Sequence, residues 1–292
     1  MIRDNLEKFG LDEANPCVTP ISTGHYKHRL DPEGVKPLDA DDHKVYRSMV
    51  GALVYIALGT RPDIAYATSL VSSALHAPLK ADMWAVKRVW KYLKHTVDQC
   101  LVYSDPDSTI RITTDSNYAG CLKSGRSHTA CVAWMFGAPA SWKSCRQPTV
   151  ALSTSEAEWM AMCAGAQELL YLLQLTKETN LPALQQQLPI TLHADNKGAL
   201  HMAREGSDST RTRHMSVRYH FVKDLVVDGT LQPLYVHSSA NPADGLTKAL
   251  PRPAHDRSMR RLLGQDQWTD PGGQVVDMLL EAQLLNINPH CM

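Results

Sequence analysis

The sequence predicts an α/β protein with a mixed sheet, preceded by a small helical extension. Several short segments alternate apolar and polar residues with the period of a strand. A long segment at 153–178 is predicted to be a single helix, and strand and helix segments then alternate towards the C-terminus. This order is typical of a sheet covered by helices. The chain has 292 residues, of which 43% are hydrophobic, so it can bury a core.

The elements before the sheet are predicted to be helical. Residues 1–45 are polar and punctuated by prolines, which indicates mainly an irregular arm, and three helices are predicted within 42–95. The second has a start signal, because Thr60 can cap it and Pro62 lies in its first turn. The third, residues 80–95, mixes apolar residues with Lys and Arg. It is either a core-packed helix with a solvated basic face or a helix that follows a nucleic-acid backbone.

The elements of the sheet begin near residue 110. The predicted strands are residues 110–115, 129–135, 140–152, 189–195 and 231–237, with a turn at Gly137 and Pro139. The helices predicted after 153–178 are residues 196–204, 213–227, one that begins near Asn241, and one at 275–285.

The composition excludes several classes of protein. Lys+Arg and Asp+Glu both number 30, so any contact with phosphate must come from a local patch. Seven cysteines without a C-x-x-C pair indicate free thiols in a reducing compartment. The longest apolar run, residues 51–58, is too short to span a bilayer, and the first residues lack a signal segment. We therefore expect an intracellular protein, cytoplasmic or nuclear, without a membrane partner.

Three aspartates are predicted at strand or helix ends of the same sheet. Asp115 and Asp195 each close a predicted strand, and Asp244 lies in the opening turn of a predicted helix. Each alone is readily explained as a turn residue or as a charge that complements a helix dipole. Together they indicate a functional site, because a sheet holds such side chains convergent.

A glutamate at the start of the long helix is the fourth candidate. Ser153 and Glu156 have the spacing of a capping box, which would leave Glu158 free to face the sheet. Because Glu156 and Glu158 differ by about 200° around a helix, only one of them can face the site. Ser155 and Glu158 have the same spacing, so capping alone does not decide between the two.

Ten short segments together resemble the Pol polyproteins of copia-type long-terminal-repeat retrotransposons. They follow the order of that family and span about residues 1–264; they are residues 51–55, 60–64, 88–94, 114–120, 140–144, 150–158, 194–199, 211–214, 218–221 and 243–248. The resemblance implies a reverse-transcriptase remnant at 1–100, a ribonuclease H-like domain at 101–264, with a five-stranded mixed sheet, and a tail of unassigned role at 265–292. The polymerase motif Tyr-x-Asp-Asp is absent from the sequence.

The resemblance also implies a site. The family's four carboxylates fall on Asp115, Glu158, Asp195 and Asp244, and Glu158 is chosen because Ala157 and Trp159 give it the family's small-Glu-large setting. They would hold two Mg²⁺ ions about 4 Å apart, with Mn²⁺ as an alternative. The implied partners are an RNA–DNA hybrid and the remaining reverse transcriptase of the same element. His237 is either a catalytic helper or a loop residue at a strand end.

A basic segment follows the third aspartate. Its candidate nucleic-acid contacts are Arg211, Arg213, His214, Arg218 and Lys223. Such a run is either a solvated helix face or a surface that contacts backbone phosphates.

The function predicted from all of this is hydrolysis of the RNA strand of an RNA–DNA hybrid. The alternative is an inactive nucleic-acid-binding relic of a degenerate element. An integrase or transposase is disfavoured, because the order Asp-Glu-Asp-Asp places the glutamate second and not last.

Overall fold

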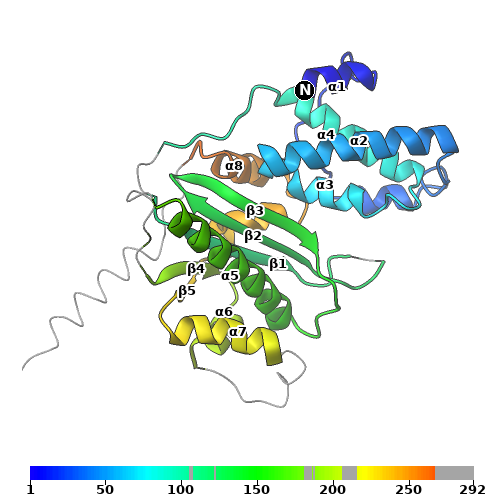
Figure 1. Cartoon of the computed structure of the whole chain (residues 1–292). Helices are drawn as coiled ribbons and strands as arrows, with labels where there is room; N and C mark the ends of the chain where they lie inside the picture. The colour runs from blue at the N-terminus through cyan, green and yellow to red at the C-terminus, as the bar shows by residue number, and fades with distance from the viewer. Residues whose placement is uncertain (105–107, 122, 181–185, 187, 206–215, 267–292) are drawn as a thin grey trace, which may run out of the picture.

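A five-stranded sheet forms the centre of the computed structural model (Figure 1), which describes residues 1–104, 108–121, 123–180, 186, 188–205 and 216–266. The strands, in the order β3-β2-β1-β4-β5, are β1 (Arg111–Asn117), β2 (His128–Met135), β3 (Ala138–Arg146), β4 (Ile190–Ala194) and β5 (Leu231–Tyr235). β2 is antiparallel to β1 and β3, whereas β4 is parallel to β1 and β5. The predicted mixed, ribonuclease H-like sheet is confirmed.

One face of the sheet is covered by α5 (Thr154–Glu178), α6 (Lys197–Glu205) and α7 (Ser216–Val227). Trp159 and Leu169 of α5 are buried in one core with Ile112 and Leu192 of the strands. Gly165 permits this close approach, because a Cβ there would lie 2.6 Å from a methyl carbon of Thr114. The spacing between α5 and β1 therefore depends on the absence of a side chain at this position.

The opposite face is covered by the turn η6 (Pro242–Leu246), by α8 (Arg252–Leu262) and by part of the helical extension. Alternate residues of β2 point to this side, where Val132 and Trp134 pack with Leu246 and Leu262. Ala65 of the extension packs against the same cluster. The sheet is thus enclosed between two layers of helices.

The helical extension (residues 1–100) contains α1 (Ile2–Lys8), η1 (His25–Arg29), α2 (Ala40–Gly59), η2 (Pro62–Ile64), α3 (Ala65–Ser72) and α4 (Lys80–His95). The three predicted helices are confirmed. Thr60 is not the cap of the second helix, because α2 continues to Gly59 and the Thr60 amide closes it on the Ile56 carbonyl. The predicted irregular arm contains α1, which Phe9 anchors by an edge contact with the ring of Trp90.

The apolar side of α4 packs in the core of the extension. Val86, Val89, Trp90 and Leu93 are fully buried, so the predicted core packing is confirmed, while the role of the basic face stays a prediction. Two of its cations bind the N-terminal arm, at Thr19 and at the Ala14 carbonyl.

Two predicted boundaries are wrong for local reasons. The third strand ends at Arg146 and not at 152, because Arg146 pairs with His128, the first residue of β2. The helix predicted from Asn241 is a short 3₁₀ turn followed by the separate helix α8. Pro251 and Pro253 account for this division, because proline is not accommodated in a helix interior.

The remaining sequence predictions concern the tail, the start of α7 and membrane segments. The helix predicted at 275–285 and residues 213–215 of the basic helix lie outside the described residues. None of the helices in the described ranges is long and apolar enough to cross a bilayer. The cysteines that the structure describes are free thiols.

Candidate active site

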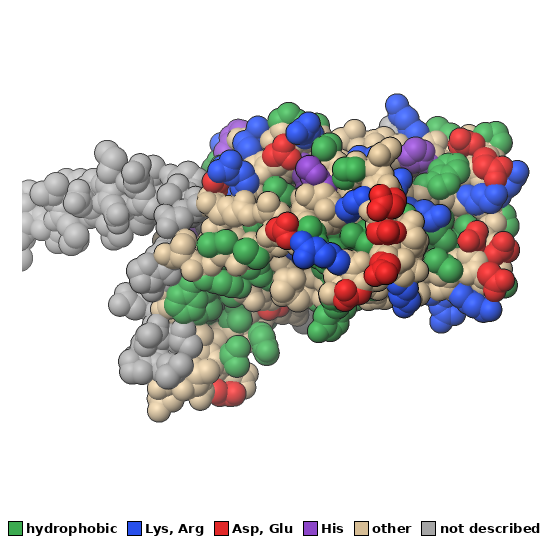
Figure 2. All heavy atoms as spheres, turned by 90° about the horizontal axis from the view of Figure 1, so that it is seen from above, with side chains coloured by type: hydrophobic (Ala, Val, Ile, Leu, Met, Phe, Trp, Pro, Cys, Tyr) green, Lys and Arg blue, Asp and Glu red, His purple; other side chains and the backbone are tan. Residues whose placement is uncertain are grey.

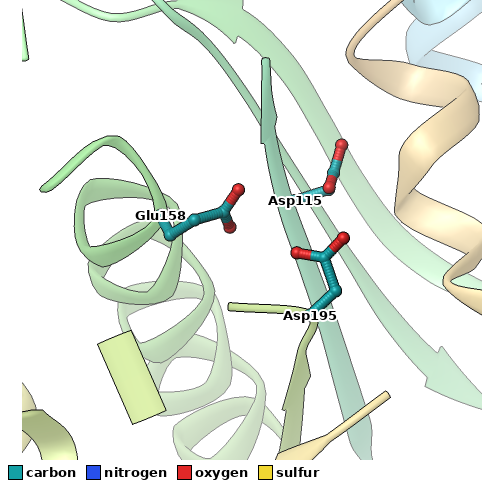
Figure 3. Close-up of side chains that lie close together, drawn as sticks. All are labelled: Asp115, Glu158 and Asp195. Atoms are coloured by element: carbon teal, nitrogen blue, oxygen red, sulfur yellow. The ribbon is translucent and has the colours of Figure 1, made fainter. Parts of the chain in front are cut away.

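Three carboxylates meet where the neighbouring strands β1 and β4 end (Figure 3). Asp115 lies near the end of β1, Asp195 directly follows β4, and Glu158 projects from the first turns of α5. One ligand atom from each lies within 4.8 Å of the other two. The strand register explains the first pair. β1 and β4 are parallel and Thr113 pairs with His193, so two residues further on Asp115 and Asp195 lie side by side.

The structure places Glu158, and not Glu156, in this group. The Glu156 carboxylate accepts the Leu152 amide at 2.8 Å, while the Ser153 hydroxyl accepts the Glu156 amide at 3.1 Å. Glu156 therefore caps its own helix. Glu158, two residues further on, faces β1 and accepts hydrogen bonds from the amide and the hydroxyl of Ser116.

Asp244 approaches the same edge from η6 and carries an ion pair with Lys248. Burial raises the pKa of Asp244 above its usual value. Lys248 opposes this shift, and the negative charge of Asp195 adds to it. The negative charge of Asp244 in turn contributes to the raised pKa of Asp115. Of the four carboxylates predicted from sequence, three thus form a compact group, and the fourth lies beside it with a lysine as its present partner.

Hydroxyl groups hold one oxygen of each carboxylate in the compact group. These hydrogen bonds join the Thr247 hydroxyl to Asp115 (2.5 Å), the Ser238 hydroxyl to Asp195 (2.5 Å) and the Ser116 hydroxyl to Glu158 (2.8 Å). Sequence reasoning missed all three donors and Lys248. The signal available for Ser116, Thr247 and Lys248 was their place next to a candidate carboxylate within the resembling segments.

Two carboxyl groups of this compact group have raised pKa values. Burial, together with the charges of Asp115 and Asp195, raises the pKa of Glu158 to about 9. Burial and the charges of Asp244 and Asp195 raise the pKa of Asp115 to about 7, against the lowering effect of the Thr247 hydroxyl and of Lys248. The second oxygen of Glu158 is buried and has no hydrogen-bond partner among the described residues.

This donor set fits a hard divalent cation. All the converging ligand atoms are carboxylate oxygens, which Mg²⁺, Ca²⁺ and Mn²⁺ prefer over nitrogen or sulfur. A cation would also provide the partner that the buried Glu158 oxygen lacks. The residues therefore have the chemistry of a metal site.

The other predicted site residues lie around this centre or outside the described part of the chain. His237 is exposed at the end of β5, and its ring contacts the Ser239 hydroxyl at 2.9 Å. Arg211, Arg213 and His214 are not described. Arg218 and Lys223 lie on α7, and the Arg218 carbonyl accepts hydrogen bonds from Trp159 and Cys163 of α5.

Arg218 also lines the rim of a cavity with Lys143 of β3. This cavity, about 360 Å³, lies between α5, α7 and the outer strands, and Gln147 and Met160 form part of its wall. On the face shown in Figure 2, acidic and basic side chains are mixed and no broad basic patch is present. Within the described residues, Lys143 and Arg218 are the cations that line this cavity.

Comparison with known proteins identifies the family. No family model matches the chain. The chain is 34% identical over 249 residues to the retrovirus-related Pol polyprotein from transposon TNT 1-94 of Nicotiana tabacum, which covers 85% of the chain and 18% of the relative. It is 30% identical to the corresponding polyprotein from transposon RE2 of Arabidopsis thaliana, over 89% of the chain and 17% of the relative. Over most of its length the chain is therefore homologous to copia-type Pol polyproteins of plant transposons.

The chain spans less than a fifth of the length of these relatives. Among solved structures it is similar to LC11-RNase H1 in complex with RNA/DNA hybrid, with a TM-score of 0.37 and 14% identity. The match covers 52% of this chain and 99% of that structure. The TM-score and the sequence identity are both low, so the fold is assigned from the strand order and strand directions described above.

Proposed function

We propose that this part of the Pol polyprotein is a metal-dependent ribonuclease H, which hydrolyses the RNA strand of an RNA–DNA hybrid. The observation that carries the proposal is the group of Asp115, Glu158 and Asp195, whose ligand atoms lie within 4.8 Å of one another in a ribonuclease H-like sheet. In this proposal residues 1–100 are the end of a reverse transcriptase, 101–264 are the nuclease and 265–292 form a tail. The rest of the polyprotein, including its reverse transcriptase, is the proposed protein partner.

The four carboxylates have distinct parts in this chemistry. Asp115, Glu158, Asp195 and Asp244 would hold two Mg²⁺ ions. When bound, such ions activate the attacking water and stabilise the leaving 3′ oxygen. The hydroxyl donors on Asp115, Glu158 and Asp195 keep one oxygen of each carboxylate in place, so the orientation of the group is set before any ligand arrives. Asp244 pairs with Lys248 through one of its oxygens, so its other oxygen would be the ligand.

The chain's own cations are the proposed contacts for the nucleic-acid backbone. Lys143 and Arg218 both line the cavity beside α5, and Lys223 lies five residues further along α7. Contacts of this kind orient a duplex but do not read its sequence. Selection of RNA as the cleaved strand would then depend on its 2′-hydroxyl groups and on the shape of the hybrid groove.

A pair of glutamate variants tests the proposal. Glu158→Gln keeps the size of the side chain but removes a charge from the metal group, so cleavage of a labelled hybrid in Mg²⁺ should fall by at least about a thousandfold. Glu156→Gln lies two residues earlier on the same helix and changes a residue of the helix cap, so it should stay within about threefold of the parent. Asp115→Asn should behave like Glu158→Gln.

The result of this assay separates the proposal from its alternative. Cleavage that needs Mg²⁺, is removed by EDTA and is lost only in the site variants supports the nuclease. A parent chain that binds the hybrid but does not cut it would instead support the inactive nucleic-acid-binding relic. Equal activity of Glu158→Gln and Glu156→Gln would remove Glu158 from the site.

A further inference from the structure

A buried hydroxyl joins the helical extension to the last helix of the nuclease. The Tyr92 hydroxyl of α4 donates to Asp63 at 2.7 Å, lies 3.1 Å from Nε2 of His255 and lies 3.0 Å from the sulfur of Met259. Because the hydroxyl proton is directed to the carboxylate, the His255 ring nitrogen is the donor to the hydroxyl oxygen. His255 of α8 is thereby hydrogen-bonded to a residue of the extension that is 163 positions away in sequence, and Met259 of α8 lies in contact with the same hydroxyl.

The extension side of this contact is rigid. Asp63 receives two hydrogen bonds from the Arg61 guanidinium, at 2.8 and 2.7 Å, and Arg61 also donates to the carbonyl and the hydroxyl of Thr96. Arg61 is 1% exposed, Tyr92 1% and His255 7%. We call Arg61, Asp63, Tyr92, His255 and Met259 the Tyr92 cluster. Since it is desolvated and fully paired, it cannot shift without leaving a buried charge unpaired.

From α8 the contacts continue to the carboxylates. Gly245 of η6 lies so close to α8 that a Cβ there would be 2.1 Å from the Ser258 hydroxyl oxygen. The segment 241–248 then supplies Asp244 itself and Thr247, whose hydroxyl holds Asp115 at 2.5 Å. Ser258 lies between His255 and Met259, so the part of α8 that supports η6 is the part that the Tyr92 cluster holds.

We propose that Tyr92 is a positioning residue for the site: through His255 and Met259 it fixes α8, and α8 fixes the segment 241–248 that carries Asp244 and Thr247. The catalytic consequence rests on the proposed function, whereas the positioning of 241–248 does not. The helical extension then contributes to the metal site although it supplies no carboxylate to it.

A matched pair of tyrosine variants of the full chain tests this inference. Tyr92→Phe removes the hydroxyl of the cluster. Tyr46→Phe removes another fully buried hydroxyl of the extension, which donates to the Val71 carbonyl of α3 at 2.6 Å. Amide hydrogen exchange of residues 241–248 is measured without metal, Mg²⁺ affinity by calorimetry, and kcat and KM on a hybrid substrate.

Tyr92→Phe should accelerate exchange in residues 241–248 and weaken Mg²⁺ binding about three- to tenfold. It should lower kcat while KM stays unchanged, because the substrate-contact residues are untouched. Tyr46→Phe should leave exchange in this segment, Mg²⁺ affinity and kcat within twofold of the parent. His255→Leu, which removes the partner on α8, should reproduce the effects of Tyr92→Phe.

The readouts keep the two proposals apart. Equal exchange in 241–248 for Tyr92→Phe and Tyr46→Phe would overturn the positioning role, whatever the activity. Faster exchange with weaker Mg²⁺ binding in Tyr92→Phe, in a parent that binds Mg²⁺ but never cleaves the hybrid, would support the positioning role and overturn only the proposed function.

Discussion

Glu158 shows how a single side chain is prepared for a cation. Ser116 binds one carboxylate oxygen, and the other is buried without a hydrogen-bond partner among the described residues. An unsatisfied buried acceptor costs about 1–3 kcal/mol. Without metal, the proton implied by the raised pKa of Glu158 lowers this cost, since a protonated carboxyl carries no charge to desolvate. A proton and a cation therefore compete for the same group.

This competition predicts how stability depends on pH at the residue scale. The pKa of Glu158 rises from 4.5 to about 9, and that of Asp115 from 3.8 to about 7, so between these values the folded chain binds more protons than the unfolded chain. The metal-free protein should therefore lose stability as pH rises from about 5 to 9. Binding of Mg²⁺ should become tighter over the same range, because the ligands must be deprotonated.

Thermal unfolding in EDTA at pH 5 and pH 8 measures the first effect, and calorimetric titration with Mg²⁺ measures the second. Glu158→Gln cannot titrate and should flatten both dependences, whereas Glu156→Gln should retain them. Metal-free stability that increases steadily from pH 5 to 9 in the parent would show that these carboxyl groups are not protonated in the folded state.

At the scale of elements, the sequence located the site better than it located the contacts that hold it. Strand ends revealed Asp115 and Asp195, because alternation is a local pattern and the parallel register then brings the two together. The choice between Glu156 and Glu158 needed a resemblance, since both satisfy a capping spacing. No local pattern could reveal that Ser238 would meet Asp195, because that contact exists only after β4 and β5 pair.

The packing of α5 on β1 gives a second prediction. Gly165→Ala would place a methyl group 2.6 Å from Thr114 and 2.9 Å from Ile112, so α5 must move away from the strand. Overpacking costs about 1–3 kcal/mol. The gain in helix propensity returns only about 1 kcal/mol. We expect a net loss of up to about 2 kcal/mol in the free energy of unfolding, together with weaker Mg²⁺ binding as Glu158 moves from Asp115.

Gly51→Ala is the matched control in α2. A Cβ at Gly51 meets nothing within 4 Å, so the same change should stabilise the chain by about 0.5–1 kcal/mol without altering Mg²⁺ affinity. Urea titrations of both variants give the comparison. If Gly165→Ala proved as stabilising as Gly51→Ala, the α5–β1 contact would be looser than the structure shows.

At the scale of the whole molecule, the question is how tightly the two parts are joined. The sequence predicts a helical extension that packs against the nuclease domain, and a nuclease domain that would keep its activity without the extension. In the structure Trp142 of β3 donates to the Ala57 carbonyl at 2.7 Å, and Ala65 packs with the outer face of β2. The Tyr92 cluster buries a charged pair at the same junction. Residue types alone do not show that this sheet face is covered by the extension, because its apolar residues also suit a self-contained core.

We therefore expect the extension and the sheet to unfold together. The outer face of β2 and the His255 side of α8 would be exposed if the extension unfolded alone, and the Asp63–Arg61 pair would lose its protein surroundings. Hydrogen exchange of the full chain at increasing urea is the measurement, and amides of α2 and of β2 should lose protection at the same urea concentration. Asp63→Ala, which leaves the Arg61 guanidinium buried without its carboxylate, should lower that concentration for both elements alike by removing about 3–5 kcal/mol. Loss of protection in α2 at a lower concentration, while β2 remains protected, would show that the extension is an independent domain, and residues 101–264 would then be expected to fold alone.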